Sequence, residues 1–160
     1  MRLAYRTMRV MECVFCELLT TGQARWVAQE PDVVAFAPLP AEEFAPGHTL
    51  VVPRRHAVGV HDADESDVVA VAALVRRVSR AMLGALGATG VVVLNASGPN
   101  SGQRVAHLHF HVVPRWDDDE ETLPWLRQCS ARSLPAPAHQ LLAAELGSAS
   151  RPGSDPGWDG

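Results

Sequence analysis

Residues 107–115 read His-Leu-His-Phe-His-Val-Val-Pro-Arg, and this stretch decides the fold predicted for the whole chain. Its histidines alternate with apolar residues, and alternation at period two is typical of a β-strand. One face of that strand is expected to carry Val105, His107, His109, His111 and Val113. Three buried imidazoles would all need polar partners, so folding alone gives no reason for such a row. The pattern therefore indicates a chemical site.

Other short segments are expected to be strands, over 24–29, 33–37, 48–52 and 91–94. The first two are joined by turn-forming residues, Glu-Pro-Asp, as in a hairpin. A proline-punctuated loop follows the second. Together with the histidine strand, these segments predict an antiparallel sheet.

The main helix is expected over 62–87. Asp62 or Asp64 can cap its first turn, and Gly87 suits its end. An apolar stripe recurs at three- and four-residue steps, through Val68, Val71, Val75, Val78 and Met82. Strands, one long helix and strands again predict an α+β domain.

Length and composition predict one domain, since 160 residues with 47% hydrophobic content can bury a single core. Residues 1–11 are expected to form a flexible N-terminal extension, and 12–147 the folded domain. A last short helix is expected over 138–146, with Gly147 as its stop. Residues 148–160 are rich in Gly, Ser, Pro and Asp, which predicts a disordered tail.

The net charge of −4 shows no excess of basic residues, so extended nucleic-acid binding is not expected. No apolar run is long enough to cross a bilayer. The cysteines are Cys13, Cys16 and Cys129; an odd number without a secretion signal favours the reducing cytoplasm. The acidic run 117–121 is expected to be a solvated loop.

Two kinds of chemistry fit the histidine strand. Histidines at alternate positions could hold a hydrolytic zinc ion, with His107, His109 and His111 as ligands and an open position for water. Alternatively, a neutral imidazole could attack phosphorus and form a covalent intermediate. That reaction needs one ring nitrogen free and the other held by a hydrogen bond. A polar sheet face without function is the third interpretation.

The loop before the histidines favours the phosphorus chemistry. Residues 95–102 read Asn-Ala-Ser-Gly-Pro-Asn-Ser-Gly, and such a turn can aim successive backbone amides at an anion. Gly98 and Gly102 supply the backbone freedom. Ser101 and Gln103 add side-chain donors.

Three motifs, in this order and spacing, resemble the histidine triad (HIT) family, in its zinc-binding bacterial type. They are Cys-Val-Phe-Cys at 13–16, Pro-Gly-His-Thr-Leu-Val-Val-Pro-Arg-Arg-His at 46–56, and Gly-Gln-x-Val-x followed by the histidine stretch at 102–115, where x is a position outside the motif. The resemblance covers about residues 12–116. It implies an α+β HIT-like fold, with an antiparallel sheet and one long helix, and a homodimer.

The resemblance also implies an activity on the α-phosphate of a nucleotide. His109 would be the nucleophile that forms a nucleotidyl-histidine, and His111 would assist the leaving group. Gln103 would hold phosphate oxygens, and His48 would support the site. The expected reaction is hydrolysis of a nucleoside phosphoramidate or a dinucleoside polyphosphate. The alternatives are a nucleotidyltransferase or phosphorylase with the same intermediate, and a nucleotide-binding regulator with little turnover.

A structural Zn²⁺ is the cofactor that the resemblance implies. Cys-x-x-Cys supplies two thiolates, and a tetrahedral site needs two more ligands. By resemblance the ligand set is Cys13, Cys16, His56 and His107.

Residues that would bind the rest of the substrate are Phe15, Phe36, Leu50, Ser101, Gly102 and Arg104. The chain departs from the family pattern at two of its positions. Pro38 stands where relatives carry an acidic residue for the ribose hydroxyls, and Glu42 or Glu43 could take its place. Arg104 stands where a small hydroxyl residue is usual, and it either clamps extra phosphate charge or points away.

Overall fold

A computed structural model describes residues 12–119 and 130–148. The expected N-terminal extension, Cys129, the end of the acidic run and the tail from 149 lie outside the described residues. Within the described ranges, no helix is both long and apolar enough to span a membrane.

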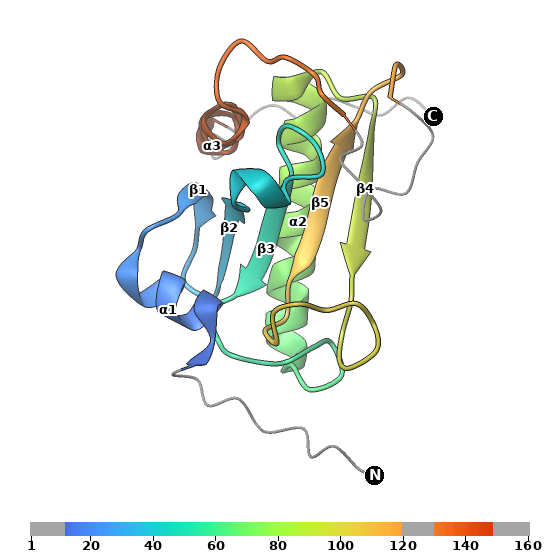
Figure 1. Ribbon diagram of the computed structural model, residues 1–160. Coiled ribbons are helices and arrows are strands. Elements are labelled where there is room, and N and C mark those ends of the chain that lie inside the picture. The colour runs from blue at the N-terminus through green and yellow to red at the C-terminus, as the bar shows by residue number, and fades with distance from the viewer. Residues whose placement is uncertain (1–11, 120–129, 149–160) are drawn as a thin grey trace.

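One antiparallel sheet forms the centre of the fold (Figure 1). Its strands are β1 (Arg25–Gln29), β2 (Val33–Ala37), β3 (Thr49–Pro53), β4 (Gly90–Asn95) and β5 (Phe110–Arg115). Their order across the sheet is β1-β2-β3-β5-β4, and every neighbouring pair is antiparallel. The predicted α+β fold with an antiparallel sheet and one long helix is confirmed.

The helical elements of the described residues are α1 (Val14–Thr21), the 3-10 turn η2 (Pro40–Glu42), α2 (Glu65–Leu86) and α3 (Ala138–Ser148). In Figure 1, α2 runs behind the sheet and α1 lies in front of it, so the two faces of the sheet differ. Alternate residues of β2 and β3 serve each face, as a pleated strand requires. The rear face joins the core around α2, whereas the front face packs on α1 through Phe15, Val34, Phe36, Leu50 and Val52.

The long helix begins close to its predicted start. Asp64 is the residue before its first turn, but its side chain makes no capping hydrogen bond. Asp62 instead accepts hydrogen bonds from the amides of Val58 and Gly59, at 3.1 and 2.8 Å. The helix ends at Gly87, which has a φ of 62° and donates its amide to the Met82 carbonyl. The predicted stop is therefore confirmed.

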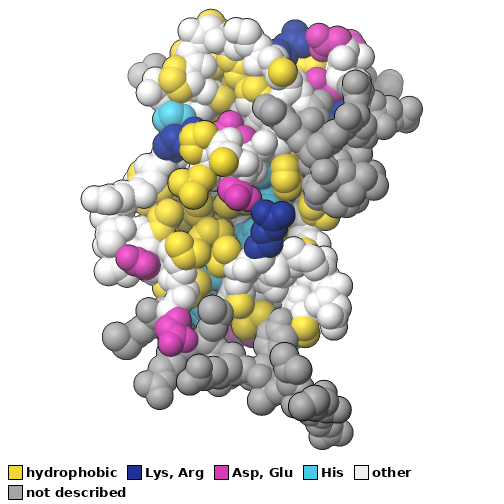
Figure 2. All heavy atoms as spheres, viewed as in Figure 1, with side chains coloured by type: hydrophobic (Ala, Val, Ile, Leu, Met, Phe, Trp, Pro, Cys, Tyr) yellow, Lys and Arg dark blue, Asp and Glu magenta, His cyan; other side chains and the backbone are white. Residues whose placement is uncertain are grey.

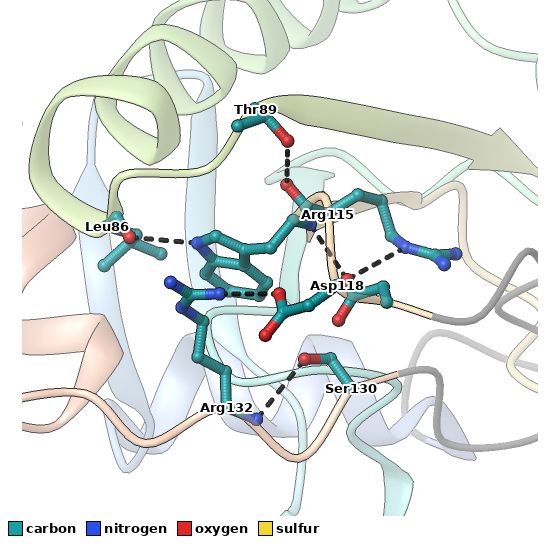
Figure 3. A network of polar contacts seen from close by, with 8 residues as sticks. Leu86, Thr89, Arg115, Asp118, Ser130 and Arg132 are labelled. Atoms are coloured by element: carbon teal, nitrogen blue, oxygen red, sulfur yellow. Dashed lines mark hydrogen bonds and ion pairs between the residues drawn. The ribbon is translucent and has the colours of Figure 1, made fainter.

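A polar network fixes the end of β5 to the segment that precedes α3 (Figure 3). The indole of the buried Trp116 donates to the Leu86 carbonyl at 3.2 Å, and Arg132 stacks over that indole while its guanidinium pairs with Asp118 at 2.8 Å. The carboxylate of Asp119 accepts from the Trp116 amide at 2.9 Å. The start of the acidic run is thus partly structural, because the Asp119 side chain is only 6% exposed.

Two predicted boundaries are wrong. The helix α3 continues through Gly147 to Ser148, so Gly147 does not stop it. The strand β5 begins at Phe110 rather than before the histidines. Between Arg104 and His107 the chain bends, and the His107 amide donates to the Val105 carbonyl at 2.8 Å. His107 therefore does not share a strand face with His111.

Candidate functional site

Three histidines gather on the front of the sheet, where β3 and β5 lie side by side. His48 precedes β3, His109 precedes β5, and Leu50 pairs with His111 across the two strands. The His111 ring centroid lies 5.1 Å from that of His48 and 5.0 Å from that of His109. Rings two residues apart meet here because the backbone straightens into β5 at Phe110.

His109 has one ring nitrogen engaged by the main chain. Its Nδ1 lies 2.7 Å from the carbonyl oxygen of His107. A carbonyl only accepts, so Nδ1 carries the proton and Nε2 keeps its lone pair. Burial lowers the pKa of His109, and the hydrogen bond to His107 opposes this only in part. His109 is thus a neutral imidazole with one basic nitrogen.

A chain of hydrogen bonds fixes the tautomers of the other two rings. The Phe44 amide donates to Nδ1 of His48 at 3.1 Å, so the His48 proton sits on Nε2. That nitrogen lies 2.9 Å from Nδ1 of His111, which must then accept. The proton of a neutral His111 is consequently on Nε2, where it can be donated to a ligand.

Burial keeps both of these rings uncharged. It lowers the pKa of His48 to about 3, with a smaller contribution from His111. It lowers the pKa of His111 to about 4, with a smaller contribution from His109. The Phe44 ring stacks on His48 at a centroid distance of 4.6 Å and an interplanar angle of 13°. The aromatic ring covers the relay and removes water from it.

The loop before the histidines is held by its own side chains. Gln103 accepts from the Gly98 amide at 2.7 Å and donates to the Val58 carbonyl at 2.6 Å. Ser101 donates to the Gly98 carbonyl at 2.6 Å. Gly98 and Gly102 have φ values of 87° and 90°, in the left-handed region that glycine adopts easily. Gln103 therefore braces the predicted anion loop, and its own contacts are to the main chain.

Asn95 at the end of β4 also supports the site. Its Nδ2 donates to the His109 carbonyl at 2.9 Å, just beyond the last residue pair of β4 and β5. The Asn95 Oδ1 accepts from Ser97 at 2.7 Å, and Ser97 accepts from the Val60 amide at 3.0 Å. This chain of bonds continues the strand pairing with a side chain and fixes the backbone of His109.

An apolar wall stands beside the histidines. Phe15 meets Phe36 edge to face at 5.5 Å and His109 in the same way at 5.4 Å. Leu50 belongs to the same cluster. Phe15, Phe36 and Leu50 are three of the residues to which the family resemblance assigns substrate binding. They lie together beside the ring that the same resemblance makes the nucleophile.

The four predicted metal ligands also converge. The ligand atoms of Cys13, Cys16, His56 and His107 all lie within 4.8 Å of one another. Nδ1 of His107 lies 3.4 and 3.5 Å from the two sulfurs, and Nδ1 of His56 lies 3.4 Å from Cys16. A tetrahedral zinc ion with bonds of about 2.0 to 2.3 Å holds such atoms roughly 3.5 Å apart. The donor set and its spacing fit zinc.

The protonation of this cluster points the same way. Nε2 of His107 lies 2.8 Å from the Pro53 carbonyl, so the lone pair is on Nδ1, facing the thiols. Burial lowers the pKa of His107 to about 4. Burial and the neighbouring Cys13 raise the pKa of the Cys16 thiol to about 11, so a bound cation would be needed to form the thiolates. Both His107 nitrogens are engaged away from His109, which disfavours one metal shared by the two.

The two departures from the family pattern have partners of their own. Arg25 donates to the Pro38 carbonyl and pairs with Glu43 at 2.8 Å. Arg104 pairs with Glu42 at 3.0 Å, so it does not simply point away. A cavity of about 440 Å³ beside α3 is lined by residues that include Arg25, Glu43 and His48, but not by His109 or His111.

Comparison with known proteins agrees with this geometry. The HIT domain family model matches residues 21–118, more than half of the chain, and the chain belongs to the HIT family. An uncharacterised HIT-like protein of Saccharolobus solfataricus is 37% identical over 69% of this chain and 79% of its own length. The adenosine 5′-monophosphoramidase of Schizosaccharomyces pombe is 28% identical over 68% of this chain and 78% of its own length.

A solved structure extends the likeness to the fold. A zinc-bound histidine triad family protein of Mycobacterium smegmatis superposes with a TM-score of 0.73 at 29% identity, covering 89% of this chain and 98% of that one. Its bound zinc accords with the Cys₂His₂ cluster described above, which also suits that metal.

Sequence reasoning missed two residues of the site. Phe44 stacks on His48 and donates its amide to it; its position four residues before a motif histidine was the available signal. Asn95 was counted only as the first residue of the 95–102 loop, although it is the last residue of a strand that pairs with the histidine segment.

Proposed function

We propose that this HIT protein hydrolyses a nucleotide derivative at its α-phosphorus through a covalent nucleotidyl-histidine at His109. The observation that carries the proposal is the hydrogen bond from Nδ1 of His109 to the His107 carbonyl, which leaves Nε2 free. The monophosphoramidase activity named for the fission-yeast relative is of this kind. A nucleoside phosphoramidate or a dinucleoside polyphosphate is the substrate we expect.

In the first step Nε2 of His109 attacks phosphorus. A P–N bond forms, and the bond from phosphorus to the leaving group breaks. A polyphosphate leaving group departs as an anion. An amine leaving group takes up one proton from solvent as it departs, and the Nε2–H of His111 orients it through a hydrogen bond. The amides of Ser101 and Gly102 would stabilise the charge on the phosphoryl oxygens.

In the second step water attacks phosphorus and the P–N bond breaks. Neutral His109 is restored, and the attacking water releases one proton, which balances the proton taken up by an amine leaving group. The wall of Phe15, Phe36 and Leu50 would hold the base. Since the step needs only an acceptor, transfer to inorganic phosphate or another nucleophile is the second candidate reaction.

The test is mass spectrometry of the intact protein after rapid acid-free quenching with adenosine and guanosine phosphoramidates. A mass gain equal to one nucleotidyl group, absent from the His109→Gly variant, supports the mechanism. Added phosphate separates the candidates, because a phosphorylase would yield a nucleoside diphosphate. Binding of nucleotide without any turnover would instead favour a nucleotide-binding regulator. The feature that supports this alternative is Pro38, which replaces the acidic residue that binds the ribose hydroxyls in relatives.

Zinc belongs to the proposal as a structural ion on Cys13, Cys16, His56 and His107. It would join α1 to the loops on either side of the site, and its chemistry there is to hold ligands rather than to react. Thiols that must stay reduced suit a reducing compartment, in line with the cytoplasmic location expected from the sequence.

A homodimer also belongs to the proposal. Within residues 12–119 and 130–148, the strand β4 pairs with β5 alone and forms an edge of the sheet. Its apolar residues are incompletely buried, and Val93 is 46% exposed. A second copy of the chain would cover this edge. Light scattering coupled to size-exclusion chromatography checks the mass, and a monomer at micromolar concentration would contradict this part.

A further inference from the structure

An ion pair joins the two loops that flank the histidines. Nη1 of Arg104 lies 3.0 Å from Oε2 of Glu42, and the two side chains are 83% and 54% exposed. Glu42 ends the turn η2, which lies in the loop between β2 and His48. Arg104 follows Gln103, whose amide reaches the His107 carbonyl at 3.5 Å. The pair therefore spans the neighbourhood of the site.

The space-filling view agrees with this placement. Figure 2 shows imidazole surface in the middle of this face, where an acidic and a basic side chain meet in front of it. Apolar surface fills the area to one side. A ligand that reaches the imidazoles from the front must pass charged groups of both signs.

Other arginines near the sheet are engaged more firmly. Arg25 is held by the Pro38 carbonyl and by Glu43, and Nε of Arg54 donates to the Glu30 carbonyl at 2.7 Å. Arg104, in contrast, pairs only with Glu42 among the described residues, and most of its side-chain surface is exposed to water. It is the guanidinium best placed to change partners.

The exchange of Glu42 for a phosphate is favourable on physical grounds. An exposed ion pair stabilises a protein little, because both charges remain hydrated. A phosphate group carries more charge than a carboxylate and matches the planar fork of a guanidinium through two parallel hydrogen bonds. A polyphosphate should therefore displace Glu42 from Arg104 without loss of fold stability.

We infer that Arg104 selects substrates whose leaving group carries a phosphate, and that Glu42 holds it in the free protein. This inference rests on the proposed function and narrows its substrate class to nucleoside polyphosphates over phosphoramidates. In the proposed mechanism, the loop amides and His111 would contact the phosphoryl group that His109 attacks. Arg104 follows Gln103 in the chain and is exposed, so it can bind the phosphate that is linked to the attacked one in the leaving group.

The kinetic test compares two substrates that give the same adenylyl intermediate, diadenosine triphosphate and adenosine 5′-phosphoramidate. Arg104→Ala should lower kcat/KM for the triphosphate by about ten- to a hundredfold, the usual loss for a hydrogen-bonded charge. It should change the phosphoramidate value by less than about twofold, because ammonia offers no phosphate. Arg104→Lys should recover only part, since it keeps charge but not the fork.

Two further variants sharpen the kinetic test. Glu42→Gln should raise kcat/KM for the triphosphate by about two- to fivefold, because Glu42 then no longer competes with the substrate phosphate for Arg104. Arg77→Ala is the matched control: Arg77 forms a similar exposed pair with Glu30 at 2.6 Å on α2, behind the sheet. It should leave both substrates unchanged. Equal losses on both substrates with Arg104→Ala would overturn the inference.

A binding test separates this inference from the hydrolase proposal. Calorimetry with AMP and ATP should show tighter binding of ATP, and Arg104→Ala should remove the difference while leaving the Kd for AMP unchanged. If this pattern holds without turnover of either substrate, the hydrolase proposal fails and the inference stands. If ATP binds no better than AMP to the parent protein, the inference fails whatever the turnover.

Discussion

His107 and His109 lie two residues apart, and a main-chain carbonyl holds each of them, but through opposite ring nitrogens. Pro53 accepts from Nε2 of His107, so the lone pair on Nδ1 turns toward the two cysteine sulfurs. The His107 carbonyl accepts from Nδ1 of His109, so the lone pair on Nε2 stays available. The same type of side chain thus belongs to the closed Cys₂His₂ cluster at position 107 and to the open histidine site at position 109.

The difference teaches that the role of each histidine is decided by its acceptor. Both rings are buried, and burial lowers the pKa of both. Charge therefore does not distinguish them. What distinguishes them is which nitrogen the backbone occupies, and this follows from the bend of the chain before β5.

The largest expected effect comes from removing the open ring. His109→Gly should lower turnover by about a thousandfold or more, because no other group can form the covalent bond. Melting temperature and zinc content should stay near those of the parent protein. Activity assays combined with metal analysis check both halves, and unchanged turnover would eliminate the covalent mechanism.

The next largest effect comes from opening the closed cluster. Cys13→Ser should lower the free energy of unfolding by about 3 to 5 kcal/mol, since loss of a structural metal is among the severe changes. Turnover per folded molecule should fall by much less. Thermal unfolding and zinc content measure this, with Cys129→Ser as the control that should keep its metal. A parent protein that contains no zinc, with an unaltered melting temperature in the variant, would refute the cluster's role.

A third prediction concerns pH and the pair His48 and His111. Their folded pKa values of about 3 and about 4 lie below the ordinary value of 6.5. Above pH 6.5 both rings are neutral in the folded and unfolded protein, and the free energy of unfolding is at its full value. As the pH falls from 6.5 toward 4 and then 3, the unfolded protein binds protons that the folded protein does not, so the free energy of unfolding decreases. The loss should be on the order of a few kcal/mol.

Denaturant unfolding between pH 7 and pH 4 measures this loss. The His48→Gln variant, which cannot protonate at that position, is the comparison and should lose less stability over the same interval. Identical slopes for the two proteins would show that these rings are not the cause.

The smallest effect should come from Asn95. Asn95→Ala removes one hydrogen bond to the His109 carbonyl and should lower kcat by about three- to tenfold with little change in KM. Ser97→Ala, one step further along the same chain of bonds, should have a smaller effect. A change in KM alone would mean that Asn95 contacts the substrate instead of fixing the backbone.

Much of the fold could be predicted because its signals are local. Short apolar segments bounded by turn-forming and proline residues predict β2 and β3, and the valine stripe with Gly87 predicts α2. The ends that were wrong depend on distant partners. The bend before β5 is held by the Ala57 carbonyl, which accepts from the Leu108 amide at 2.6 Å, and no local pattern shows that contact.

The site divides in the same way. The motifs and their spacing predicted two groups of residues that the structure brings together. One is the set of four ligands of the metal cluster, and the other is the set of rings of His48, His109 and His111. Which nitrogen each ring presents could not be predicted, because it depends on carbonyls and amides that the fold brings near. The partner of Arg104, Glu42, lies 62 residues away and was weighed only as a ribose contact.

The amide of Phe44 gives the histidine relay a fixed direction. An amide nitrogen can only donate, so the hydrogen bonds run in one direction, from Phe44 to His48 and from His48 to His111. The proton of neutral His111 is therefore on Nε2, the nitrogen that faces away from His48. Side-chain replacement at position 44 leaves that polarity intact, whereas proline there erases it. The orientation of the relay is thus encoded in the path of the loop, and a change of loop length is a greater threat to it than a change of residue.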